Sequence, residues 1–291
     1  MKALSKKLKF GAPLVPVIRL DGVIDAGGRF GRGLNLNDLD EVIEHAFSMK
    51  KARAVALAIN SPGGSPVQSA LIFKRIRALS EEKKIPVIAF CEDVAASGGY
   101  MLAIAGDEIY ADESSILGSI GVISASFGLT GLIERYGIER RVYTAGEHKG
   151  ALDPFLPEDP EDVERLKKIQ TEVFEHFTAL VRERRGAKLK AEESALFTGD
   201  VWAGRSAVDL GLADDLGDMH SVLKQKFGKS VKLRLIETRK GFLRSKLGFD
   251  AAMALDAFAR KPVARGGLGI ELADGLLSVL ERRGLWSRFG K

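Results

Sequence analysis

Short apolar segments alternate with helical segments between residues 13 and 145, and this alternation constrains the fold more than any other feature of the sequence. AVALAI (54–59) has no polar residue and PVIAFCE (86–92) has only its final glutamate, as expected for parallel strands buried on both faces. The 67–84 segment between them has the length and composition of a helix. The pattern therefore predicts a layered α/β fold with a mostly parallel sheet flanked by helices.

The same reading assigns the rest of the chain. Strands or extended segments are expected at 13–24, 108–112, 115–124, 140–146 and 231–237, and helices at 36–52, 97–106, 128–137 and 159–186. Two amphipathic helices are expected at 249–260 and 270–286. We predict a basic N-terminal arm (1–12), one catalytic domain (13–227) and a basic, helical C-terminal appendage (228–291).

The net charge of +5 is concentrated at one end of the chain. Residues 228–291 hold 14 Lys/Arg and 6 Asp/Glu, so the remainder is slightly acidic. This distribution argues against nucleic acid as a partner, whereas the basic amphipathic tail suits peripheral contact with an anionic membrane surface. Packing of the tail against the body or another subunit is the alternative.

The sequence contains no apolar stretch long enough to be a signal peptide or to span a membrane. A cytoplasmic protein is expected, either free or attached peripherally at the inner membrane. The single cysteine, Cys91, excludes an internal disulfide, and it lies in an apolar segment where cysteine usually serves as a small hydrophobic residue. The four histidines are scattered, so no metal or cofactor site is predicted.

Ser97 is the candidate nucleophile, because it lies between a predicted strand and a predicted helix, directly before two glycines. A serine hydroxyl needs a base to activate it and backbone donors to hold the oxyanion that forms. The amide of Gly98 at the helix start and that of Gly64 in the SPGG turn could supply those donors. Both glycine pairs are also common turn signals, so the motif alone does not decide.

The base is more difficult to identify from the residues alone. No histidine has an obvious carboxylate to orient it, and lysine is the other known activator of serine. A lysine acts as a base only when its amine is uncharged, which requires burial. Lys149 lies in the glycine-containing segment TAGEHKG, where the local sequence alone favours an exposed loop lysine.

Together these residues resemble the signal peptide peptidase A family of serine proteases over about 15–217. The motifs that carry the resemblance are INSPGGS, VAASGGYMLA, LGSIGVI, TAGEHKGALDPF and FTGDVWAGRSAVDLGLADDLG, in the family's order. The intervals from Ser97 to Ser119 and to Lys149, 22 and 52 residues, are similar to those of the single-repeat bacterial members.

The resemblance implies a Clp protease/crotonase-like fold and hydrolysis of short hydrophobic peptides, such as cleaved signal peptides, through an acyl-enzyme. It implies Ser97 as nucleophile, Lys149 as general base and Ser119 as the residue that orients the lysine. Gly64 and Gly98 would form the oxyanion hole, and Asn60 would support the substrate groove. The family also implies a homo-oligomeric ring without a metal or cofactor.

Two departures from the family are visible. Members commonly carry an N-terminal membrane anchor, which this sequence does not show, and Gly150 follows the lysine where Asp or Ser is common. Two other functions stay open at this point. One is a crotonase-type acyl-CoA enzyme, which would need a CoA pocket and usually acidic catalysts; the other is a catalytically idle scaffold or membrane-surface adaptor.

Overall fold

The computed structural model describes residues 12–26, 33–237, 284–287 and 289. The predicted helices at 249–260 and most of 270–286 lie outside these residues, as does nearly all of the N-terminal arm. The elements in chain order are β1 (Leu14–Asp21), α1 (Leu36–Ser48), β2 (Val55–Ser61), α2 (Pro66–Lys83), β3 (Val87–Ala96), α3 (Gly98–Ala103), β4 (Glu108–Ala111), β5 (Ile116–Gly118), α4 (Thr130–Arg135), α5 (Pro160–Arg185), η1 (Gly186–Lys188), α6 (Glu193–Leu196), β6 (Val201–Ala203), α7 (Gly204–Asp209), β7 (Asp215–Leu216), α8 (Met219–Phe227) and β8 (Lys232–Leu235).

The strands form one sheet, in the order β6-β5-β3-β2-β1-β8, with β4 and β7 branching from β3. Every pairing is parallel except that of β5 with β6. The first half of β3 pairs with β4 and the second half with β5. β3 therefore changes its neighbour from β4 to β5 just beyond Cys91. Ser97 follows directly after the part of β3 that pairs with β5. The layered α/β fold with a mostly parallel sheet is confirmed.

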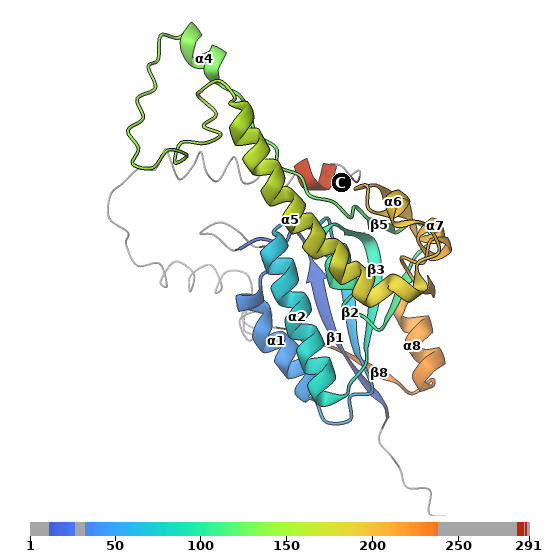
Figure 1. Ribbon diagram of the computed structural model, residues 1–291. Coiled ribbons are helices and arrows are strands. Elements are labelled where there is room, and N and C mark those ends of the chain that lie inside the picture. Colours follow the sequence, from blue (N-terminus) through green and yellow to red (C-terminus); the bar gives the residue numbers. More distant parts are fainter. Residues whose placement is uncertain (1–11, 27–32, 238–283, 288, 290–291) are drawn as a thin grey trace, which may run out of the picture.

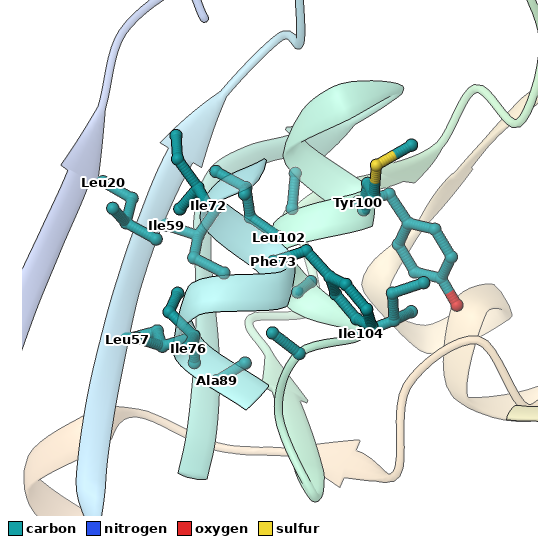
Figure 2. Close-up of a cluster of buried hydrophobic side chains, with 14 of the residues drawn as sticks. Leu20, Leu57, Ile59, Ile72, Phe73, Ile76, Ala89, Tyr100, Leu102 and Ile104 are labelled. Atoms are coloured by element: carbon teal, nitrogen blue, oxygen red, sulfur yellow. The ribbon is translucent and has the colours of Figure 1, made fainter. Parts of the chain in front are cut away.

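The core lies on both faces of the sheet, as the apolar strands predicted. On β2, Leu57 and Ile59 pack on the side of α1, α2 and α3, whereas Ala56 and Ala58 pack on the side of α8. Figure 2 shows the first side, where residues of α2 such as Ile72 meet strand residues and the start of α3. Tyr100, Leu102 and Ile104, which are labelled in that view, are fully buried. The helix that follows Ser97 is thus fixed on all sides.

Three helices begin directly after a polar residue whose side chain caps them. Asn35 and Ser65 cap α1 and α2 by accepting bonds from Asp38 and Gln68 amides, and Asp159 caps α5 just before Pro160. These side chains satisfy amides that would otherwise be unpaired at the helix start.

α5 is the longest helix, and only its C-terminal part belongs to the core. Its 26 residues span about 39 Å, and its buried residues begin at Phe177. The N-terminal half runs outward to a projecting segment that carries α4 (Figure 1). We call residues 121–159 the arm; none of them is buried.

The arm is where the sequence prediction of a strand at 140–146 was wrong, since these residues form loop and turn. No strand of the described residues pairs with them, so their backbone groups join no ladder there. In the 115–124 segment only Ile116–Gly118 pairs as a strand. The short helix expected at 128–137 is confirmed as α4.

β8 begins five residues beyond the predicted boundary at 227, and it pairs with β1 at the edge of the sheet. The start of the predicted appendage therefore extends the sheet of the preceding domain. The division of the chain into a basic N-terminal arm (1–12), a catalytic domain and a C-terminal appendage otherwise stays a prediction.

Candidate active site

Ser97 lies at a sharp turn between β3 and α3, with φ 52° and ψ −121°. Positive φ is unfavourable for a residue with a side chain, and such strain persists only where the surrounding structure enforces it. The Ser97 amide donates to the Gly118 carbonyl at 2.8 Å, which fixes the turn against β5. Serine at this place commonly caps the helix, yet Ser97 makes no side-chain cap bond. The half-buried hydroxyl is therefore left available for another partner.

The SPGG turn packs directly against Ser97. A Cβ placed on Gly63 would lie 2.8 Å from the Ser97 Cβ and 2.8 Å from the Gly98 nitrogen, and Gly63 has φ 97°. Only glycine fits this contact without displacement. The sequence reading did not single out Gly63, because its role depends on the approach of a turn that lies 34 residues earlier in the chain.

Gly64 is held by the segment that follows β1. The Ile24 amide donates to the Gly63 carbonyl and the Ser65 amide donates to the Ile24 carbonyl, both at 2.8 Å. These two bonds fix the peptide units on either side of Gly64. Within the described residues, neither the Gly64 amide nor the Gly98 amide has an acceptor. Two donors are thus free on the two turns that meet at Ser97.

Ser119 is the second residue with strained backbone near this place, with φ 52°. Its amide donates to the Asp200 carbonyl at 2.6 Å, and the residue is buried except for 8% of its surface. Ser97, Ser119 and Gly64 line one cavity of about 800 Å³. Three of the predicted site residues are therefore brought together, and the backbone of a fourth, Gly98, adjoins them.

Asn60 does not line this cavity. Its side chain accepts from the Val94 amide at 3.3 Å and donates to Asp93 at 3.4 Å, and its carbonyl accepts from Gly22. It therefore ties β2 to β3 and to the end of β1, immediately before the two turns. Its part in a substrate groove stays a prediction.

Lys149 lies on the arm and is exposed, and it is not among the residues that line the cavity. Its amide donates to the Gly146 carbonyl, and the side chain makes no hydrogen bond or ion pair with any described residue. One isolated chain therefore does not bring the predicted base to the predicted nucleophile.

The opposite walls of the cavity come mostly from residues that the sequence reading did not single out. Four residues of α5 line it (Lys167, Gln170, Thr171 and Phe174), and apolar contacts come from Val122, Ile123, Phe197 and, in the short C-terminal helix, Leu285. The i, i+3, i+4, i+7 spacing on α5 is visible in the sequence. Only the fold shows that these four residues of α5 face the cavity that contains Ser97 and not the core.

Cys91 is excluded as a rival nucleophile. Burial in the core raises the pKa of its thiol to about 12, so the thiolate is scarcely formed at neutral pH. Packing alone explains this cysteine.

Three searches place the chain among known proteins. The family model "Peptidase family S49" matches residues 80–233, which is more than half of the chain. The chain is 50% identical over 95% of its length to a Brucella abortus protein named "Na(+)/H(+) antiporter NhaA", and covers 37% of that protein. It is 36% identical over 67% of its length to the Arabidopsis thaliana "Serine protease SPPA, chloroplastic", and 28% identical over 72% to "Protease 4" of Haemophilus influenzae.

The chain covers 29% and 34% of those last two relatives, so it spans well under half of each of the three. The match to a solved variant of a membrane-bound stomatin-specific protease covers 78% of this chain and 99% of the protease chain, at 16% identity and a TM-score of 0.49. Within the described part of the chain, no helix is both long and apolar enough to cross a membrane.

The sequence matches place the chain, with its mostly parallel α/β sheet, in the class of the peptidases. More particularly, the chain belongs to peptidase family S49, and the resemblance to signal peptide peptidase A is confirmed.

Proposed function

We propose that this chain is a serine peptidase that hydrolyses short hydrophobic peptides such as cleaved signal peptides, with Ser97 as the nucleophile. One observation carries the proposal: the Ser97 hydroxyl sits on a strained strand-to-helix turn, in a cavity that adjoins two unpaired amides. A free hydroxyl beside free donors is the arrangement that acyl transfer requires. The name of the Arabidopsis relative, a serine protease, supports the same chemistry.

The proposed reaction runs through an acyl-enzyme. The Ser97 oxygen attacks the carbonyl carbon of the peptide while the uncharged Lys149 amine takes the hydroxyl proton. The Gly64 and Gly98 amides donate to the oxyanion of the tetrahedral intermediate. When the C–N bond breaks, the Lys149 ammonium returns the proton to the leaving amine. A water molecule then attacks the ester, Lys149 again takes a proton, and Ser97 is released with the acid product.

Because Lys149 is exposed in the isolated chain, we propose that the base reaches Ser97 from the arm of a second copy in a homo-oligomeric ring. The arm exposes large apolar side chains, among them Phe127 at 81% and Tyr143 at 92%. Exposed apolar surface of this kind is typical of a segment that packs on a partner. Packing would also exclude water from the lysine, and desolvation lowers the pKa of an amine toward the neutral range. In the assembled site Ser119, which lines the same cavity as Ser97, would orient the amine.

The cavity supports the choice of hydrophobic peptides. Its walls include Val122, Ile123, Phe174 and Phe197, and no carboxylate lines it among the described residues. The acidic catalysts usual in a crotonase-type enzyme are thus not found there.

The test is covalent labelling with a fluorophosphonate, a probe that reacts with activated serines. We expect wild type and His148→Ala to be labelled and to cleave an apolar peptide, and Ser97→Ala and Lys149→Ala to do neither. Lys149→Ala should keep its stability within about 0.5 kcal/mol, because the side chain is exposed and unpaired. An unlabelled wild type that retains acyl-CoA would support the crotonase function instead. Loss of folding in Lys149→Ala would make the lysine structural.

A further inference from the structure

One face of α5 gives the cavity a polar stripe opposite its apolar walls. Lys167, Gln170, Thr171 and Phe174 all line the cavity, and their spacing of three, four and seven residues places them along one side of the helix. The stripe runs from an aromatic residue at one end to a cation at the other. Seven residues of helix separate these ends by about 10 Å.

Lys167 is the sole ionisable side chain among the residues that line the cavity. Its ammonium lies 3.3 Å from Glu164, one turn earlier on α5, but both side chains are mostly exposed. A pair of this kind is weakly held and exchanges readily with other partners. Among the described residues, the lining of the cavity therefore carries one positive charge and no negative charge.

Gln170 adds a second donor beside that charge. Its side chain is half-buried, and it makes no hydrogen bond to any described residue. Thr171 cannot serve in the same way, because its hydroxyl donates to the Lys167 carbonyl at 2.9 Å. The lysine ammonium and the glutamine amide are thus the two donor groups that this face of α5 offers to a ligand.

We propose that Lys167, assisted by Gln170, binds a carboxylate of the peptide substrate. The inference rests on the proposed peptidase function and names a specificity residue for it. A carboxylate is the anion that every short peptide carries, at its C-terminal end. An extended peptide advances about 3.3 Å per residue, so 10 Å corresponds to about three residues. A substrate residue packed on Phe174 would then place a carboxylate about three residues away at Lys167.

A free chain end and an acidic side chain share this chemistry, and three peptides of one apolar sequence separate them. The first has a free C-terminal carboxylate, the second has a C-terminal amide, and the third is amidated with glutamate as its last residue. Each is cleaved by wild type, by Lys167→Met and by Lys168→Met. Lys168 is an exposed neighbour on α5 that does not line the cavity, so its variant is the matched control.

We expect wild type to favour the free acid over the amide by about fivefold in kcat/KM, mostly through KM, because the lysine is partly exposed. Lys167→Met should reduce the ratio of free acid to amide to about one, whereas Lys168→Met should keep the ratio of wild type. If the glutamate peptide is favoured as strongly as the free acid, the site reads any carboxylate in reach; if it is not, the site reads the chain end.

A wild type that cleaves acid and amide equally, or a Lys167→Met variant that keeps the preference, overturns the carboxylate site while leaving the peptidase function intact. A wild type that cleaves none of the three peptides, and is not labelled by the fluorophosphonate, overturns the proposed function itself.

Discussion

At the scale of single residues, the site depends on places where a side chain cannot fit. A Cβ on Gly64 would lie 2.0 Å from the Ile24 carbonyl oxygen, and Gly64 has φ 139°. The contact is with backbone, so it cannot be relieved by rotating a side chain. The same contact aims the unpaired Gly64 amide, which we assign to the oxyanion hole.

Gly64→Ala is therefore expected to lower kcat by about 10²-fold or more, the usual effect of losing an oxyanion donor. Steady-state kinetics on an apolar peptide measure this loss. Gly22→Ala is the matched control, since Gly22 also has positive φ, 108°, but a Cβ there meets nothing within 4 Å. That variant should lose about 1 kcal/mol of stability and keep its kcat. Equal losses of kcat in both variants would contradict the assignment of the Gly64 amide.

At the scale of elements, the helix that follows Ser97 is anchored from behind. The Tyr100 hydroxyl donates to the Leu212 carbonyl at 2.9 Å. The neighbouring Gly211 carbonyl accepts from the fully buried Arg185 at the end of α5, at 2.6 Å, and Arg185 also pairs with Asp214 at 2.8 Å. α3, α5 and the loop before β7 are therefore joined through one polar network beneath the site.

Asp214 makes this network sensitive to pH. Burial by itself raises the pKa of Asp214, but the hydrogen bond from Lys188 and the charge of Arg185 outweigh burial, and the net pKa is lowered. A carboxyl whose pKa is lowered in the folded state stabilises the fold above its unfolded pKa of about 3.9. That contribution is lost as the pH falls through the lower, folded value.

Asp214→Asn is thus expected to cost about 3 kcal/mol at pH 7, because it leaves Arg185 buried without its anion. Denaturant unfolding of both proteins between pH 7 and pH 2 measures the effect. The difference between them should be constant down to about pH 5 and shrink below pH 4. A difference that grows toward low pH would show that the sign is wrong.

The elements show how far the sequence predicts this structure. The apolar segments 54–59 and 86–92 predicted buried parallel strands, and β2 and β3 confirm them. This prediction succeeded because a strand buried on both faces consists almost entirely of apolar residues. The strand predicted at 140–146 was wrong, because strand propensity alone does not provide a neighbouring strand to pair with. The long helix 159–186 was predicted from its cap and charges, but not that half of it leaves the core.

The candidate site could also be predicted from the sequence only in part. Ser97 and the glycines were predictable because tight turns require particular residues at particular places. The α5 stripe was not, because nothing in a run such as Lys167 to Phe174 states which surface it faces. Lys149 was identified by resemblance to a family, and its exposed position on the arm follows only from the fold.

At the scale of the whole molecule, the proposed nucleophile and oxyanion donors lie on the body, and the proposed base lies on the arm. The body holds Ser97, Ser119 and the two glycine amides, and the arm holds Lys149 among exposed apolar side chains. An arm that packs head to tail on the next copy gives a heterologous interface, which closes into a ring when the rotation allows. Each site would then be complete only in the assembly.

The most direct test of this account is complementation between two inactive variants. Ser97→Ala and Lys149→Ala are each inactive by the proposed mechanism, and we would co-express them in equal amounts so that their subunits mix. If the base comes from a neighbouring copy, the mixture should recover about a quarter of wild-type peptidase activity, because one site in four pairs an intact serine with an intact lysine by random assembly. Activity that stays at the level of the separate variants, while the mixed assembly forms, would contradict it.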